Sequence, residues 1–209
     1  MFEIPSIIYF LLILLIIPIF MVGKLIKKKD IVYKLSLFLF LMEIFKQTYL
    51  LINNMWSIWY LPFQLCSMPM YLFIFKNEKG YLKFIRTYSL LGAICAICYP
   101  MDMIAHGPIL CFHSYLFHYI IILMSSIIYF NKFDKGSFKD ATILFLKMCL
   151  IVTIINLSLN SFGEINMFYI NCLRKPYQPI INKITNTYLA NTLYILVIII
   201  VSYLIEHFI

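Results

Sequence analysis

Residues 4–23 read IPSIIYFLLILLIIPIFMVG, a run without a single charged side chain. A helix of this length rises about 30 Å at 1.5 Å per residue, which matches the hydrocarbon thickness of a bilayer. The run has no basic region before it and no small-residue cleavage site after it, as a secretory signal would have. It therefore predicts a membrane-spanning helix.

The rest of the chain has the same character, because 63% of its 209 residues are hydrophobic and the mean hydropathy is +0.91. Further apolar runs predict spans at about 31–52, 61–76, 84–100, 112–131, 141–162 and 187–206. The run 61–76 is short and interrupted by Pro69, so six spans are the alternative to seven. We predict an all-α, polytopic transmembrane helical bundle that forms one domain over residues 1–209.

The positions of the lysine and arginine residues indicate how the chain crosses the membrane. The net charge is +8, and most cations lie in three short segments, at 24–29, 76–86 and 132–139. Because cytoplasmic loops are enriched in lysine and arginine, these segments are predicted to be cytoplasmic, with the N-terminus outside and the C-terminus inside. The charge pattern does not indicate nucleic acid as a partner. The cysteines lie mostly in apolar segments, so we expect no disulfide framework.

Polar groups inside spans usually face the interior of the bundle and mark functional sites. Four such groups, each on a different predicted span, lie roughly 7–9 Å below the outer surface at 1.5 Å per residue: Lys46, Cys66, His118 and Asn156. Glu43 is three residues from Lys46, on the same helix face, where the two charges can neutralise one another.

A thiol beside an imidazole is a plausible catalytic pair, because histidine can take the thiol proton and return it to a leaving alkoxide. Lys46 or Asn156 could then donate to a developing oxyanion. The predicted depth is near that of phospholipid ester carbonyls, which favours an acyl transferase or a lipid hydrolase. Phospholipid or lysophospholipid would be the partner, with Arg174 and Lys175 near its phosphate.

Each of these residues also has a structural interpretation. Cys66 can be a small buried hydrophobe, His118 a hydrogen-bonded core residue, and Glu43 with Lys46 an intramembrane ion pair. Asn156 can join helices. A metal site at Cys95, Cys98, Cys111, His106 and His113 is the weaker alternative, since C-x-x-C in an apolar helix lacks the turn of a zinc knuckle. We expect no metal and no cofactor.

An ordered series of short motifs resembles the transmembrane protein 164 family, including its bacterial YwaF-like members. The motifs are EIFK at 43–46, LPFQLC at 61–66, YP at 99–100, YLFH at 115–118 and EINMFYINCLRKP at 164–176. The resemblance implies six or seven helices and a bacterial plasma-membrane location. It also implies acyl transfer to lysophospholipids that depends on one cysteine and one histidine.

Carried over by position, the resemblance assigns the essential histidine to His118 and a site asparagine to Asn166. In vertebrate members the cysteine is expected directly after the proline, where this chain has Phe63. Cys66 lies three residues later and fits the bacterial L-P-x-x-L-C pattern, in which a histidine usually stands in place of Gln64. We therefore predict Cys66 and His118 as catalytic, and Glu43 and Gln64 as substrate-binding.

Two functions of other classes are also compatible with the sequence. A solute-binding or transport protein, such as the substrate-capture subunit of a vitamin importer, has similar size and helix number. Its polar band would hold a water-soluble ligand. In a purely structural or assembly protein, the same band would only join the helices.

Overall fold

The computed structural model describes residues 6–75, 77–99, 107–171 and 186–208, and the described part contains helices and connecting loops but no strand. Six of the described helical segments are long and apolar enough to cross a membrane: Ile7–Leu25, Asp30–Ile52, Tyr81–Cys98, Pro108–Asn131, Phe138–Phe162 and Thr187–Phe208. A seventh apolar segment, Leu65–Phe75, is shorter. The prediction of an all-α, multi-pass bundle is confirmed, and the short third segment lies where Pro69 predicted an interruption.

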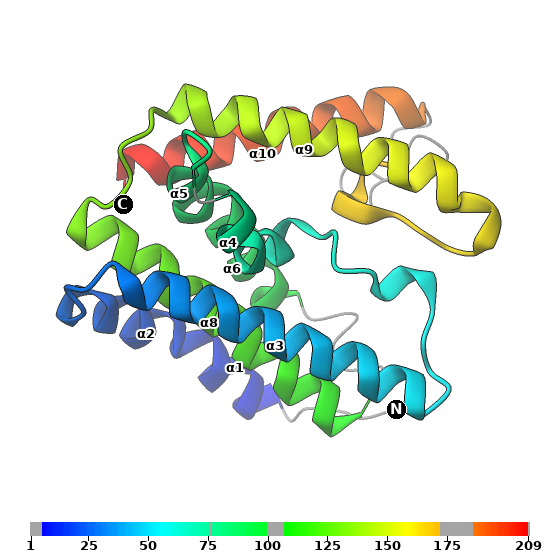
Figure 1. The fold of residues 1–209 in the computed structure, drawn as a ribbon, viewed down its shortest axis with the longest axis horizontal. Coiled ribbons are helices and arrows are strands. Elements are labelled where there is room, and N and C mark those ends of the chain that lie inside the picture. Colours follow the sequence, from blue (N-terminus) through cyan, green and yellow to red (C-terminus); the bar gives the residue numbers. More distant parts are fainter. Residues whose placement is uncertain (1–5, 76, 100–106, 172–185, 209) are drawn as a thin grey trace.

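Helices α8 and α9 belong to different layers of the bundle, and the short helices α4 to α6 lie between these layers (Figure 1). The elements of the first half are α1 (Ser6–Leu14), α2 (Ile16–Val22), η1 (Gly23–Leu25), α3 (Asp30–Ile52), η2 (Ile58–Tyr60), η3 (Leu65–Tyr71) and α4 (Leu72–Phe75). Those of the second half are α5 (Tyr81–Phe84), η4 (Ile85–Ser89), α6 (Leu90–Cys98), α8 (Pro108–Asn131), α9 (Phe138–Leu159), η5 (Asn160–Phe162), η6 (Met167–Tyr169) and α10 (Thr187–Phe208).

Helix α8 is the most buried of the candidate spans and holds a central position in its layer, where it contacts α2, α3, α6 and η4. Its polar side chains donate to backbone carbonyls of other elements: Tyr119 to Leu12 at 2.7 Å, and Ser125 to Ile85 at 3.0 Å. Inside a bilayer, such hydrogen bonds and close packing hold helices together, since lipid tails are as apolar as leucine. This central position makes α8 a rigid support for its two histidines.

Two prolines explain why the first and third segments are not regular helices. Pro18 clashes with the carbonyl of Leu14, four residues earlier, and α1 ends at that residue. Pro69 lies inside η3, a 3₁₀ helix whose exposed carbonyls must be satisfied within the protein. Ser36 of α3 donates to the carbonyls of Pro69 and Met70, at 2.8 and 3.1 Å, and thereby stabilises the unwound segment.

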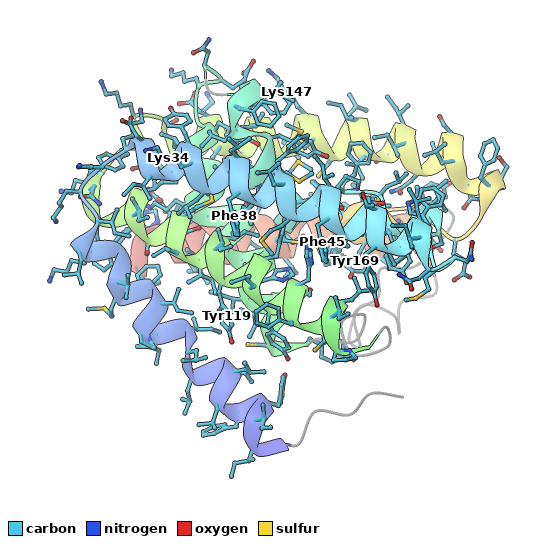
Figure 2. All side chains as sticks on the ribbon, turned by 60° about the horizontal axis from the view of Figure 1, so that its bottom comes forward. Lys34, Phe38, Phe45, Tyr119, Lys147 and Tyr169 are labelled. Atoms are coloured by element: carbon cyan, nitrogen blue, oxygen red, sulfur yellow. The ribbon has the colours of Figure 1, made fainter. Side chains whose placement is uncertain are left out.

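The outer surface of the bundle is strongly apolar. Along α3, Phe38 and Phe45 are about half exposed, whereas Lys34 marks the beginning of the helix (Figure 2). Exposed leucines and isoleucines also cover α1, α9 and α10. Lipid is the solvent that this surface requires, because soluble monomers do not expose apolar patches of such size.

One end of the bundle carries a buried ionic network. Lys83 pairs with Asp134 and Glu206 at 2.7 Å each, and Arg86 pairs with the same carboxylates at 2.8 and 2.7 Å. Two cations face two anions, so the network is formally neutral. It joins the start of the α5–α6 segment, the α8–α9 loop and the end of α10, three parts that are distant in the sequence.

Candidate active site

Glu43 and Lys46 form the polar centre of α3. Their charged groups lie 2.7 Å apart, and Glu43 is only 5% exposed. Gln47, one turn after Glu43, donates to the Glu43 carboxylate at 2.6 Å and to the backbone carbonyl of Tyr60 at 2.6 Å. The predicted ion pair is therefore present, and Gln47 connects it to the loop that leads to LPFQLC.

Cys66 lies at the beginning of η3, half buried and with a free thiol. Its backbone packs on Gly92 of α6, where an added Cβ would lie only 3.4 Å from the Cys66 nitrogen. The charges of Lys46 and Glu43 are close enough to interact with the thiol, and so is the hydroxyl of Tyr194 on α10. Cys66 thus lies among polar groups from two other helices.

His118 lies on α8 and is 6% exposed. Its Nδ1 is 2.6 Å from the carbonyl oxygen of Ser114, one turn earlier. Because a carbonyl only accepts hydrogen bonds, Nδ1 carries the hydrogen and Nε2 carries a lone pair. This Nε2 is buried, and no described group bonds to it, the Cys66 thiol included. The Lys46 ammonium interacts electrostatically with His118 as well as with Cys66.

His113 is a second buried histidine on α8, and its role differs. Its Nε2 donates to the carbonyl of Met42 on α3 at 2.9 Å, and its ring stacks between Phe45 and Phe117. The ring therefore joins α8 to α3 directly beside the Glu43–Lys46 pair. Among the buried histidines of the described structure, only His118 has a fully buried ring nitrogen without a hydrogen-bond partner.

A loop after α9 is held beside Cys66 by side-chain amides. The Asn156 amide nitrogen donates to the Met167 carbonyl at 3.0 Å, and its oxygen accepts from the Met167 N–H at 2.8 Å. The Gln64 oxygen accepts from the N–H of Phe168 at 3.1 Å. Non-helical backbone within a bilayer needs such partners, because water is absent there.

The same loop has an unusual backbone. Phe168 and Tyr169 both have φ of 56°, a left-handed conformation that bulky residues seldom adopt. Asn166 accepts from the backbone of Asn171 at 2.9 Å, and Asn191 of α10 donates to the Asn171 carbonyl at 2.9 Å. Such strain persists only where surrounding contacts impose it, and it is concentrated at functional sites.

The predicted site residues thus form two sets. In the first, Glu43 is paired with Lys46, whose charge acts on both Cys66 and His118, but no hydrogen bond joins Cys66 to His118 among the described residues. In the second, Gln64 and Asn156 bond to the loop at Met167, to which Asn166 itself belongs. Gln64 links the two sets, since it precedes Cys66 by two residues. Arg174, Lys175, Cys172 and His106 lie outside the described residues.

The described site also contains side chains that the sequence interpretation did not select: Gln47, Tyr194, Asn171 and Asn191. The i, i+4 spacing of Glu43 and Gln47 could have indicated the first of them. Cys95, Cys98, Cys111 and His113 do not form a cluster of three metal-ligating side chains in the described part of the chain.

The fold defines the class of protein, which is a multi-pass helical membrane protein with polar side chains among its apolar helices. The model of the TMEM164 family matches residues 1–205, and the chain belongs to this family. No curated protein and no solved structure matches the chain significantly.

Proposed function

We propose that this protein is an integral membrane acyltransferase that moves a fatty acyl chain between phospholipids by a thioester on Cys66. In the first step the sulfur attacks the ester carbonyl of a donor phospholipid; a C–S bond forms and the ester C–O bond breaks. The thiol proton passes by way of His118 Nε2 to the departing alkoxide oxygen. A lysophospholipid leaves.

In the second step the hydroxyl of an acceptor lysophospholipid attacks the thioester. A C–O bond forms, the C–S bond breaks, and the hydroxyl proton passes by way of Nε2 to the sulfur. The acceptor becomes a diacyl phospholipid and the enzyme regains its thiol. Atoms and protons balance over the two steps without a cofactor or a metal. Water in place of the acceptor would give hydrolysis.

The observation that supports this proposal best is the state of His118. Its Nδ1–H is fixed by the Ser114 carbonyl, so the lone pair on Nε2 is held in one orientation, buried and unbonded by any described group. Fixing one ring nitrogen through a carbonyl is how proteins set the tautomer of a base. The Lys46 ammonium acts electrostatically on both Cys66 and His118, and under this proposal it would stabilise a thiolate or an oxyanion.

The other residues would have supporting roles under this proposal. Lys46, Asn156 and Asn166 would polarise the reacting carbonyl, and Glu43 and Gln64 would contact the substrate. Arg174 and Lys175 would approach the lipid phosphate. The site would face the outer leaflet of the bacterial plasma membrane, with the N-terminus outside and the C-terminus in the cytoplasm.

Purified protein in phosphatidylcholine vesicles with a labelled acyl chain and added lysophospholipid tests the proposal. Wild-type protein should transfer the label, and Cys66 should carry an acyl group that hydroxylamine releases. Cys66→Ala should abolish both signals, whereas Cys111→Ala removes a buried α8 cysteine and should preserve them. Undiminished transfer by Cys66→Ala would eliminate the thioester.

The same preparations distinguish the alternative of a solute-binding or transport protein. The transport hypothesis predicts neither acyl transfer nor a thioester. It predicts instead that the protein binds a water-soluble vitamin and copurifies with an energising partner, and this result would rule out the enzyme. Loss of transfer in His118→Ala but not in Cys66→Ala would instead support direct attack by the acceptor hydroxyl, with His118 as its base.

A further inference from the structure

The three lysine-rich segments meet around one cavity at the end of the bundle away from the candidate active site. The cavity has a volume of about 240 Å³, and its lining includes Lys29, Lys79, Lys83, Lys135 and the carboxylate of Glu78. Lys29 precedes α3, Lys79 precedes α5, and Lys135 lies between α8 and α9. Four cations therefore face one anion in a cavity built from three separate loops.

The position of the cavity relative to the spans is defined by these loops. Candidate spans begin at Asp30, Tyr81 and Phe138, shortly after Lys29, Lys79 and Lys135, and Lys83 lies in the first turn of the span that begins at Tyr81. The cavity therefore lies where the apolar segments end. In a bilayer this is the level of the lipid phosphates.

The charge of the lining is not fully compensated by the protein. Lys83 is paired with Asp134 and Glu206 in the ionic network, and Lys79 lies 3.6 Å from Asp140. Lys29 and Lys135 are exposed, and no ion pair joins either of them to a carboxylate within the described part of the chain. These two ammonium groups are available to an anion.

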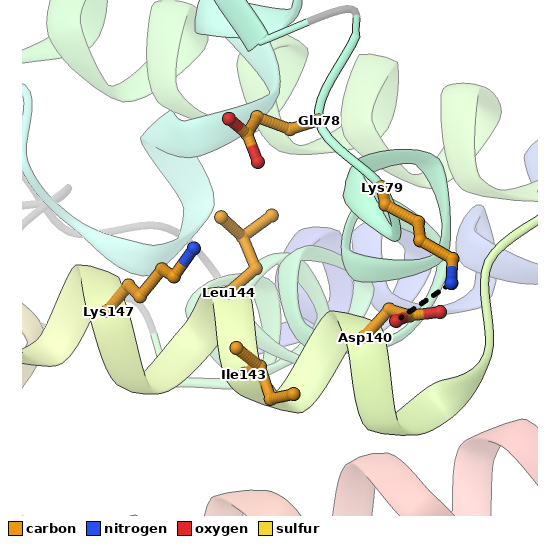
Figure 3. Close-up of a pocket in the computed structure, with 6 residues that line it drawn as sticks. All are labelled: Glu78, Lys79, Asp140, Ile143, Leu144 and Lys147. Carbon is orange, nitrogen blue, oxygen red and sulfur yellow. Dashed lines mark ion pairs between the residues drawn. The ribbon is translucent and has the colours of Figure 1, made fainter.

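A smaller cavity of about 140 Å³ adjoins the first and shares Glu78 and Lys79 with it. Figure 3 shows Lys79 directed at Asp140, while Glu78 and Lys147 extend toward the space beside Leu144 from different elements. Two lysines and two carboxylates line this smaller cavity, so its charge is balanced. The excess of positive charge lies in the larger cavity.

Two glycines permit the loops to close around the larger cavity. A Cβ on Gly136 would lie 2.6 Å from the Cα of Gly80, and a Cβ on Gly80 would lie 2.7 Å from the backbone of Asp140. Any side chain here would separate the backbones. The contact fixes the distance between the loops that carry Lys79 and Lys135.

We propose that this lysine-lined cavity binds a phosphate group, presented at the membrane surface by an anionic phospholipid such as phosphatidylglycerol. Basic pockets between the ends of membrane helices suit anionic headgroups, and ammonium groups are strong donors to phosphate oxygens. The site lies at the opposite end of the bundle from Cys66. It is therefore independent of the proposed acyl transfer.

Native mass spectrometry of the full chain, released from phosphatidylcholine nanodiscs and titrated with phosphatidylglycerol, tests this proposal. The double variant Lys29→Gln/Lys135→Gln should weaken phosphatidylglycerol binding about tenfold or more. The matched control is Lys28→Gln/Lys139→Gln, which removes the same charge from the loop before α3 and from the first turn of α9 without changing the lining. The control should bind nearly as wild type, and the melting temperature of each variant confirms its folding.

A second arm adds inorganic phosphate as competitor. Displacement of phosphatidylglycerol by phosphate would identify the phosphate group itself as the ligand, whereas retention would identify the intact lipid headgroup at the same site. Equal weakening in the cavity and control variants would overturn the proposal, because general surface charge would then explain binding. Unchanged binding in Lys29→Gln/Lys135→Gln would overturn it as well.

Discussion

Asn156 makes two hydrogen bonds to the backbone of one residue, Met167. The side-chain amide thus bonds the N–H and the carbonyl of Met167, as neighbouring backbone groups do in a helix or a sheet. Asn156 is fully buried on α9, and Met167 begins the turn that contains the left-handed Phe168 and Tyr169. The amide therefore holds this strained turn next to Gln64, two residues before Cys66.

Replacement of Asn156 by leucine should reduce the stability of the protein markedly. The Met167 N–H would lose its partner while remaining buried, which costs about 1–3 kcal/mol, and the Met167 carbonyl would keep only the Ile170 N–H at 3.3 Å. We expect the free energy of unfolding in detergent micelles to fall by about 1–3 kcal/mol. Asn53→Leu is the control, because Asn53 is exposed and bonds only within its own helix. Equal destabilisation by the two variants would contradict this role.

The two histidines of α8 should respond differently to substitution. His118→Gln removes the free ring nitrogen, and loss of a general acid–base typically costs about 10²–10⁴-fold in rate. His113→Gln removes a hydrogen bond to Met42, so it should lower the melting temperature and reduce acyl transfer less than tenfold. Transfer rates normalised to folded protein provide the comparison. Similar rate losses in both variants would contradict the assignment of His118 as base.

Substitutions of Glu43 and Lys46 should have strongly non-additive effects on the free energy of unfolding. Glu43→Gln leaves the Lys46 ammonium without its described partner, and breaking a buried pair costs about 3 kcal/mol. The double variant Glu43→Gln/Lys46→Met should cost less than the sum of the single variants. A double-mutant cycle on unfolding in micelles measures this coupling. The Lys79–Asp140 pair is the control: Lys79 is 80% exposed, so its coupling should be close to zero.

The spans were predictable from the sequence because membrane helices obey simple constraints of length and polarity. The interruption of the third segment followed from Pro69, and the Glu43–Lys46 pair followed from its i, i+3 spacing. In each case the deciding interaction is local, within one helix or one segment. The gathering of Lys29, Lys79 and Lys135 at one end agrees with the alternation of basic loops along the chain.

The contacts that complete the site were not predictable, because they depend on the path of two irregular loops. Gln47 reaches the Tyr60 carbonyl, and Gln64 reaches Phe168, which is 104 residues away in the sequence. The periodicity of apolar residues in the sequence does not predict the path of an irregular loop. The ionic network is a similar case, since Lys83 and Glu206 come together only through the packing of α10.

The contact between Gly80 and Gly136 allows a final test, because the two glycines separate loop packing from backbone strain. A Cβ on Gly136 would lie 2.6 Å from the Cα of Gly80, and the Gly136 backbone is not in the left-handed region. Gly80 has φ of +85°, so alanine there is strained in addition to meeting the Asp140 backbone at 2.7 Å. Gly136→Ala should lower the free energy of unfolding by about 1–3 kcal/mol, and Gly80→Ala should lower it further.

The loss of stability in Gly136→Ala measures the close approach of the loops without the backbone strain that Gly80→Ala adds. Thermal unfolding of both variants and of the wild-type protein in the same micelles gives the two losses. If the loops are held together as the Gly80–Gly136 contact indicates, Gly136→Ala should also weaken phosphatidylglycerol binding, since Lys79 and Lys135 would move apart. A melting temperature of Gly136→Ala equal to that of the wild-type protein would mean that the loops yield to a methyl group, and that the cavity between them has no fixed width.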